Sequence, residues 1–324
     1  MTGKERYRAL CAREQSIPIF SMDWWLDCVC GEDKWDVLLY CSDSDSEAVE
    51  AAFPFYVPYK KGIIMPAFTQ TMGIWFNPDF EKENYSRNLL RKQNICEQLI
   101  QRLPEHTYFV QNFHHSFTDW LPFYHDDYQQ TTRYTYIIPD IGDENRVWEN
   151  FSKEMKKNIE KAHTKYKIIV KKGMPTEDFL WLNEQIFKRR EKTGIKFDVL
   201  KKIIEYNRTE GRGDIWGAYD EQNQLHAAQF IVWQENVAYC IAGGSNPDFR
   251  KSGAHALVMW EVIRFASTVS RSFDFAGSMM KGVEYFNRGF GAIQTPYFTI
   301  SKGSRPWMRA AVNFLRNYLP VHSK

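Results

Sequence analysis

The sequence has no clear excess of charge of one sign, and this balance argues against two classes of protein. Its 324 residues hold 42 lysines and arginines and 40 aspartates and glutamates, so the formal net charge is +2. Proteins that coat nucleic acid, or that are drawn to membranes by charge, carry a marked basic excess. A local basic groove remains compatible with this total.

Long apolar runs are also absent, and residues 1–20 carry no secretory signal. A helix that spans a bilayer needs about 20 mostly apolar residues, and no stretch approaches that length. The six cysteines are scattered through a chain that is too long to need disulfide staples. We therefore expect reduced thiols and a cytoplasmic protein with no membrane span.

Motifs of several enzyme classes are missing. The sequence contains no nucleophile elbow, no Walker loop and no dinucleotide-binding fingerprint. Cys28 and Cys30 form a pair with no second pair and no nearby histidine, and His114 and His115 lack a third ligand at a suitable spacing. A metal site is therefore not expected.

Aromatic residues, in contrast, are abundant at 16%, with 11 Trp, 17 Tyr and 23 Phe. Such rings fill large cores, although they also line sites for sugars, bases and extended ligands. The hydrophobic share of 44% and the charged share of 25% are ordinary for globular proteins and exclude wholesale disorder. The length suggests about two domains.

The apolar pattern divides the chain into two series of elements. The first has predicted strands at residues 35–40, 53–59, 62–65, 108–112 and 133–138, helices at 86–103 and 117–124, and an acidic turn at 41–50. The polar, proline-containing segment 139–143 then breaks the pattern. We therefore predict one domain of residues 1–138 and a second of residues 139–324.

The second series repeats the order of the first in a longer form. Its predicted helices are 145–166, 175–193, 197–208, 254–267, 282–288 and 305–318, and its strands are 167–170, 214–219, 225–234, 236–242, 272–275 and 296–301. The repeated order predicts a duplication. The segment from Phe151 to Lys172 contains eight lysines and only two glutamates. This segment is either a solvated helix face or the rim of an anion site, and the wide spread of the lysines favours the solvated face.

The segment 239–256 is the most informative part of the chain. A predicted strand ends at two glycines, a loop carries Arg and Lys, and a further glycine precedes an apolar helix. Exposed N–H groups at a helix start, beside basic side chains, can bind an anion. A tight strand-to-helix turn is the alternative explanation. The residues of this predicted anion site, which the resemblance described next makes a donor-binding site, are Gly243, Gly244, Arg250, Lys251, Ser252, Gly253, Ala254 and His255.

Within this segment, Arg250-x-x-Gly253-x-His255 resembles the acyl-CoA pyrophosphate loop of the GNAT acyltransferases, [QR]-x-x-G-x-[GA]. The first and fourth positions match. The sixth is histidine instead of glycine or alanine, so His255 is interpreted as a capping or phosphate-contacting group.

Three further segments resemble the FemABX-like branch of that superfamily. They are the D-x-x-G-S sequence from Asp274 to Ser278, the F-x-R-x-F-G sequence from Phe286 to Gly291, and the helix from Trp148 to Ala162. Segments of the first half also fit, so the resemblance covers nearly the whole chain. It implies a mixed α/β fold of two tandem GNAT-like domains, each a twisted mixed sheet flanked by helices, with the donor site in the second.

The resemblance also implies an N-acyltransferase. The donor would be acyl-CoA or another activated acyl group, used as a co-substrate without a permanently bound cofactor, and the acceptor an amine of a cell-envelope precursor or another metabolite. Two alternatives stay open: an aminoacyl-tRNA-dependent enzyme of peptidoglycan bridge formation, and a non-catalytic binding module. The tRNA-dependent bridge enzymes often carry a coiled-coil arm, and this sequence has no heptad run for one. The low net charge also attracts tRNA weakly, so acyl-CoA is favoured as the donor.

Direct attack by an amine needs a positioned donor, an oxyanion site and a proton acceptor. Backbone groups near 242–244 are candidates for the oxyanion site. Asp274, Glu284 and Tyr285 are candidate proton acceptors, although Asp274 can equally be a structural hydrogen-bond acceptor, and Glu284 can complement a helix dipole. Ser278, Phe286 and Arg288 are predicted to contact substrate.

Overall fold

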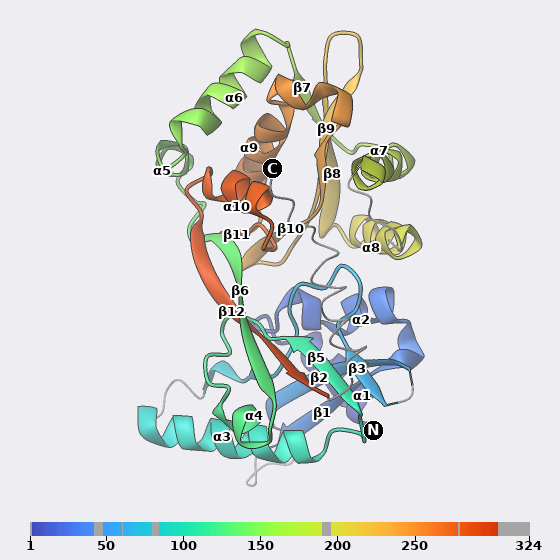
Figure 1. Ribbon diagram of the computed structural model, residues 1–324, viewed down its shortest axis with the longest axis vertical. Helices are drawn as coiled ribbons and strands as arrows, with labels where there is room; N and C mark the ends of the chain where they lie inside the picture. The colour runs from blue at the N-terminus through green and yellow to red at the C-terminus, as the bar shows by residue number, and fades with distance from the viewer. Residues whose placement is uncertain are drawn as a thin grey trace. The chain divides into compact units, whose positions relative to one another are not determined.

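Two units make up the chain, and each contains a mixed sheet with helices packed against it (Figure 1). The structure, a computed structural model, describes residues 2–41, 48–59, 61–79, 84–189, 196–277 and 279–303. Of these residues, unit 1 holds those up to Tyr134 and those from Pro296, and unit 2 holds Thr135–Thr295.

Unit 1 has the strand order β1-β2-β3-β5-β12, with β4 paired to β2. The strands are β1 (Trp35–Cys41), β2 (Val49–Tyr59), β3 (Gly62–Ile64), β4 (Trp75–Phe76), β5 (Tyr108–Asn112) and β12 (Ile293–Lys302). The helices are α1 (Gly3–Cys11), α2 (Asp23–Cys30), α3 (Tyr85–Gln101) and α4 (Leu121–His125). Neighbouring strands are antiparallel except β3 and β5, which are parallel.

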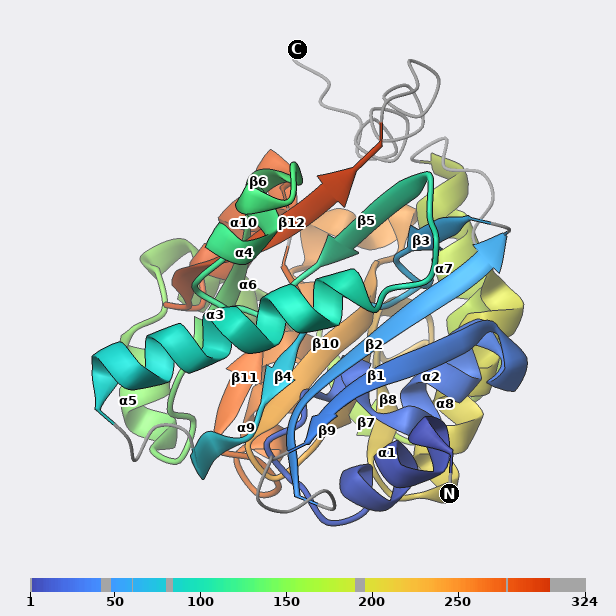
Figure 2. The ribbon, with the colours of Figure 1, turned by 90° about the horizontal axis from the view of Figure 1, so that it is seen from below.

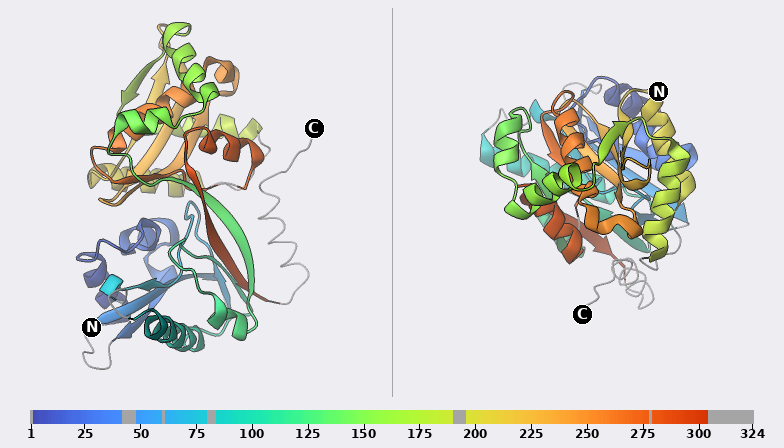
Figure 3. Two further views of the ribbon diagram at one scale, coloured as in Figure 1. Left: turned by 90° about the vertical axis from the view of Figure 1, so that its left-hand side faces the viewer. Right: turned by 90° about the horizontal axis from the view of Figure 1, so that it is seen from above.

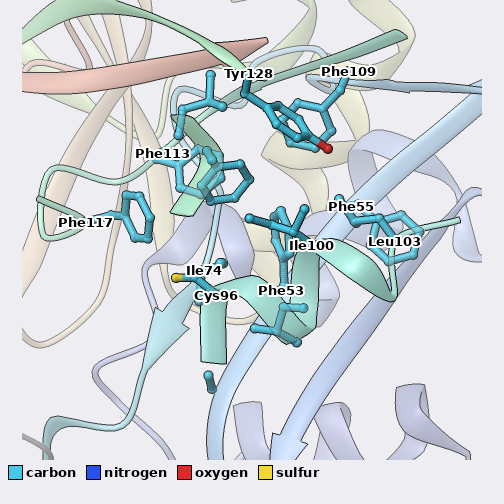
Figure 4. Close-up of a cluster of buried hydrophobic side chains, with 14 of the residues drawn as sticks. Phe53, Phe55, Ile74, Cys96, Ile100, Leu103, Phe109, Phe113, Phe117 and Tyr128 are labelled. Carbon is cyan, nitrogen blue, oxygen red and sulfur yellow. The ribbon is translucent and has the colours of Figure 1, made fainter. Parts of the chain in front are cut away.

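A cluster rich in aromatic side chains forms a core of unit 1 (Figure 4). Three rings form a continuous cluster: Phe53 of β2, Phe113 after β5 and Phe123 of α4. The ring centroids of Phe53 and Phe113 are 5.8 Å apart, and those of Phe113 and Phe123 are 5.1 Å apart. Helix α3 lies across the sheet (Figure 2) and adds Ile95, Cys96, Leu99 and Ile100 from one face. Because these side chains recur at helical spacing, the sequence pattern reveals this helix.

Unit 2 has the strand order β6-β11-β10-β9-β8-β7. The strands are β6 (Gln129–Ile138), β7 (Ile169–Lys172), β8 (Gly213–Tyr219), β9 (Leu225–Trp233), β10 (Val237–Ser245) and β11 (Ser272–Asp274). The helices are α5 (Glu144–Glu149), α6 (Lys153–Thr164), α7 (Thr176–Arg189), α8 (Phe197–Thr209), α9 (Ala254–Ala266) and α10 (Lys281–Arg288), and a 3₁₀ helix, η4, covers Pro247–Ser252. Within the described part of this unit, β10 and β11 are parallel, and the other neighbouring strands are antiparallel.

The two units repeat one order of elements. Apart from β4 and η4, the series along residues 35–138 is β1-β2-β3-α3-β5-α4-β6, and the series along residues 213–302 is β8-β9-β10-α9-β11-α10-β12. The last strand of each series pairs outside its own series: β6 pairs with β11, and β12 pairs with β5. Figures 1 and 3 show β6 and β12 as two long strands, each with a part in each unit. The predicted fold class, related halves built on mixed sheets with flanking helices, is confirmed.

The predicted helix 145–166 is wrong as one element, because it is divided into α5 and α6. Between them, the N–H of Ser152 donates to the carbonyl oxygen of Gly289 at 2.9 Å, and the Ser152 hydroxyl accepts from the N–H of Met155 at 3.2 Å. Ser152 therefore caps a new helix. The buried residues Phe151, Met155 and Ile159 stay four positions apart through this segment, which hides the break in the sequence.

Smaller differences concern the ends of elements. Helix α4 begins at Leu121 and not at residue 117, and α1 and α2 were not predicted. Helix α1 is marked by a capping box formed by Thr2 and Glu5, which the apolar pattern does not contain. The predicted closing helix 305–318, most of the acidic turn 41–50 and the end of the predicted helix 175–193 lie outside the described residues.

Candidate active site

Strand β10 has an open edge at its carboxyl end. It pairs with β11 only over Val237–Tyr239, whereas its pairing with β9 continues to Ser245. Past Tyr239, the part of the chain that the structure describes offers β10 no strand partner on the side of β11. Backbone N–H and C=O groups that point to that side are therefore available to an extended ligand.

A β-bulge lies in this open stretch. The pairing with β9 shifts register between Cys240 and Ala242, so one extra residue is inserted there. Gly243 and Gly244 follow with φ angles of 148° and 150°, values that residues other than glycine rarely adopt. A Cβ on Gly243 would lie 2.3 Å from the carbonyl oxygen of Ala228. The bulge and the glycines fix an irregular backbone at the predicted oxyanion position.

The loop after β10 leads through η4 into helix α9. Gly253 precedes the helix at φ 81° and ψ 0°, and a Cβ on it would lie 2.2 Å from the carbonyl oxygen of Asn158 in α6. The Ser252 hydroxyl accepts from the N–H of Ala254 at 3.2 Å, while Arg250 and Lys251 are exposed. Both explanations of this segment therefore have support. Gly253 is required for packing, as expected of a tight turn, and a helix begins beside two exposed basic residues, as expected of an anion site.

Basic residues of α6 extend this surface. Because Asn158 touches Gly253, α6 runs directly beside the loop, and the Lys161 amine donates to the side-chain oxygen of Asn158 at 3.2 Å. Lys161 is half-buried, whereas Lys153, Lys157 and Lys165 are exposed. The predicted solvated face is therefore correct for most of these lysines, but Lys161 stands next to the predicted donor loop.

His255 faces α10. Its ring stacks on Phe286 with a centroid distance of 4.3 Å and an interplanar angle of 0°. Phe286 in turn contacts Phe290 at 5.1 Å. The structure thus brings a predicted donor-binding residue and a predicted substrate-binding residue together as a stacked pair.

Asp274 is the last residue of β11 and is 2% exposed. Its Oδ1 accepts hydrogen bonds from the Thr135 hydroxyl and, at 2.8 Å, from the N–H of Ala276. Burial raises the pKa of Asp274 to about 7, although both hydrogen bonds act to lower it. Tyr239 lies opposite Asp274 in the parallel register, so the carboxyl group stands where the open edge of β10 begins.

The other predicted proton acceptors lie on α10. Figure 1 shows α7 and α8 on one face of the unit 2 sheet and α6, α9 and α10 on the other. Phe275 contacts Phe290, just after α10, at 5.5 Å, and side chains alternate along a strand, so Asp274 points to the face of α7. Glu284 and Tyr285 are therefore not brought to Asp274.

Two further predicted residues of α10 pair with each other, and a third contacts α6. Glu284 pairs with Arg288 at 3.0 Å, and the Tyr285 hydroxyl donates to Oε2 of Glu154 at 2.5 Å. That bond with Glu154 raises the pKa of Tyr285, whose ring is 55% exposed. Ser278 lies outside the described residues.

Sequence reasoning missed two polar residues beside the open edge, Thr135 and Gln229. Nothing in the strand pattern around Thr135 distinguishes it. Gln229 has a signal, because it is an amide inside a strand that is otherwise nearly all apolar, and the structure buries it.

Among the residues that the structure describes, no three histidine, cysteine or acidic side chains gather as metal ligands. Within the same ranges, no helix combines the length and the apolar character that a membrane crossing requires.

Comparisons with known proteins agree on one fold. Residues 150–287 match the family model described as an acetyltransferase (GNAT) domain. A comparison with curated proteins finds no match.

Three solved structures illustrate the similarity. FemX has a TM-score of 0.63 at 9% identity, over 92% of this chain and 96% of FemX. The C-terminal domain of a putative lysylphosphatidylglycerol synthetase from Agrobacterium fabrum has a TM-score of 0.56 at 8% identity, over 97% and 95%. A tandem GNAT protein from the clavulanic acid biosynthesis pathway has a TM-score of 0.50 at 9% identity, over 94% and 95%. At these identities the similarity is one of fold, and it confirms the predicted fold of two GNAT-like halves.

Proposed function

We propose that this chain, an acyltransferase with a GNAT-type domain in residues 150–287, transfers an acyl group from acyl-CoA or another small thioester to an amine. One observation carries the proposal: the open edge of β10 begins beside the buried carboxyl group of Asp274. An extended donor can hydrogen-bond to such an edge and place its carbonyl carbon near a proton acceptor.

In the proposed reaction, the amine nitrogen attacks the thioester carbonyl carbon and forms the C–N bond. The carbonyl electrons move onto oxygen, where backbone N–H groups near Ala242 and Gly243 stabilise the negative charge. The Asp274 carboxylate accepts the proton that the nitrogen loses. As the intermediate collapses, the C–S bond breaks and the thiolate leaves. A pKa of about 7 suits this task, because the group is partly ionised near neutral pH.

The donor phosphates would lie at the loop before α9. Arg250 and Lys251 are exposed there, Lys161 is close by, and α9 begins there, so that the positive end of its dipole lies at the loop. The acceptor class implied by the FemABX resemblance is an amine of a cell-envelope precursor or another metabolite, in the cytoplasm. A small thioester is favoured over charged tRNA because the chain carries a net charge of only +2.

Donor binding and turnover test this proposal directly. Calorimetric titration of the full chain with acetyl-CoA, a long-chain acyl-CoA and an aminoacyl-tRNA identifies the donor, and thiol release in the presence of simple amines measures transfer. We expect a CoA thioester to bind and to release thiol. Binding of tRNA alone would favour the aminoacyl-tRNA alternative, and a folded sample that binds no donor would favour a non-catalytic module.

A further inference from the structure

Gln229 is a buried amide in the middle of β9. It is 1% exposed and lies in a strand whose central residues, Ala227 to Val232, are otherwise apolar. Trp233, four positions further along the strand, contacts Phe265 of α9 at 5.2 Å. By strand alternation, Gln229 points to the face of the sheet that α9 covers, and so away from the face of Asp274.

The side chain of Gln229 is bonded to the bulge of β10. Its Nε2 donates to the carbonyl oxygen of Ala242 at 2.7 Å and lies 2.9 Å from the Cys240 sulfur. A bulge removes regular ladder bonds between two strands and leaves a carbonyl in need of a donor. The amide of Gln229 supplies a donor to the carbonyl that directly follows the extra residue, Ile241, so a side chain stabilises the bulge.

Gly243 is fitted to the same side chain. It is opposite Gln229 in the register of β9 and β10, and a Cβ on Gly243 would lie 2.7 Å from Oε1 of Gln229. The amide therefore occupies the space that a side chain at residue 243 would need. Gln229 and Gly243 together determine how the backbone runs through the open edge.

We infer that Gln229 is a positioning residue for catalysis: it holds the bulge so that backbone N–H groups near Ala242 and Gly243 point at the carbonyl oxygen of the donor. This inference rests on the proposed acyl transfer. In this arrangement Gln229 contacts neither donor nor acceptor. Its effect should therefore appear in the chemical step, where the oxyanion develops, and not in donor binding.

The test is Gln229→Leu, which keeps the approximate volume and removes the donated hydrogen bond. We expect kcat to fall about 10- to 100-fold, because one well-aimed oxyanion donor is worth about that much or more, while the donor Kd stays within about twofold. Amide hydrogen exchange at 240–245 should become faster. The matched control is Asn207→Leu, which removes another fully buried amide whose Nδ2 donates to the carbonyl oxygen of Ile203 in α8, and which should lose stability without losing kcat.

Gln229→Glu gives a second, independent measurement. When protonated, the new carboxyl group can donate a hydrogen bond to the Ala242 carbonyl oxygen. When ionised, the carboxylate repels that oxygen. Relative to the wild type at the same pH, we expect kcat to be partly restored at low pH and lost as the pH rises, whereas the ratio of the donor Kd values does not follow that profile.

The outcomes separate this inference from the proposed function. Wild-type chain that releases no thiol with any donor overturns the proposed function and the inference with it. Active wild type together with an unchanged kcat in Gln229→Leu overturns the inference alone. A kcat loss that Asn207→Leu reproduces at equal loss of stability also overturns it, since the effect would then be general destabilisation.

Discussion

The hydroxyl of Thr135 in β6 donates a hydrogen bond to Oδ1 of Asp274 in β11, on the sheet face away from α10. This bond stabilises the ionised carboxylate, because a carboxylate accepts more strongly than a neutral acid. Burial acts in the opposite direction and is the larger effect, which leaves the pKa of Asp274 at about 7. Two neighbouring strands thus set the ionisation of the proposed base.

Thr135→Val should raise the pKa of Asp274 further. The carboxylate loses a donor that favours its charged form. One hydrogen bond to a charged group is worth about one pKa unit, so the pKa should rise by about that amount. Because the base must be ionised to accept a proton, activity rises with pH through the pKa of Asp274, and the rise should move to higher pH in the variant. The pH profile of kcat measures this shift.

Thr299→Val is the control for that substitution. Thr299 of unit 1 donates its hydroxyl to the Asn112 side chain at 2.7 Å, whereas Asp274 belongs to unit 2. Its pH profile should match that of the wild type. A Thr135→Val profile with an unmoved inflection would remove Asp274 as the group that controls turnover.

Asp274→Asn should lower kcat by about 10²- to 10⁴-fold, the usual worth of a positioned general base. Asparagine keeps an oxygen that can accept from Thr135 and Ala276, so donor binding should be retained. Thiol release and calorimetric donor titration measure the two effects separately. Intact turnover would leave Asp274 with a purely structural role.

The same substitution should change how stability depends on pH. The pKa of Asp274 is higher in the folded chain, about 7, than its ordinary value of 3.8. Between these values the folded chain holds a proton that the unfolded chain has lost, so this group's contribution to stability falls as pH rises from about 4 to about 7. Asp274→Asn should flatten that part of the profile of Tm against pH. A steeper profile in the variant would contradict the assigned sign.

Much of this arrangement could be predicted from the sequence, for identifiable physical reasons. Helix α9 is apolar on nearly every side, which only a buried helix tolerates. The carboxylate of Asp274 was conspicuous because two phenylalanines flank it in a strand. Gly253 and its loop stood out because glycine, basic residues and a helix start coincide.

The rest depends on contacts between distant segments. Alternation shows which residues of β6 and β12 are buried, but not that each pairs with a strand of the other series. Thr135 precedes Asp274 by 139 positions, and nothing local indicates their bond. The bulge of β10 is likewise invisible, because the register of two strands is a property of the pair.

Arg250→Ala and Gly253→Ala should separate ligand binding from packing in the donor loop. Arg250 is exposed, so its removal should weaken donor binding by about tenfold, the loss of one charge-assisted contact, with little change in Tm. Gly253→Ala should lower the free energy of unfolding by about 3 kcal/mol, since its Cβ meets the Asn158 carbonyl at a positive φ. Calorimetric titration and thermal unfolding measure the two quantities. A loss of stability in Arg250→Ala with unchanged donor affinity would make this loop a packing turn only.

Tyr285→Phe should leave turnover nearly unchanged. The Tyr285 hydroxyl is committed to Glu154 of α6, its ring is largely exposed, and α10 lies on the sheet face opposite to Asp274. Loss of one exposed hydrogen bond costs about 1 kcal/mol of stability or less. We therefore expect kcat and the donor KM to stay within about twofold, measured by thiol release beside Asp274→Asn under the same conditions. A loss as large as that of Asp274→Asn would transfer the role of proton acceptor to Tyr285 and place the reacting carbonyl on the α10 side of the sheet.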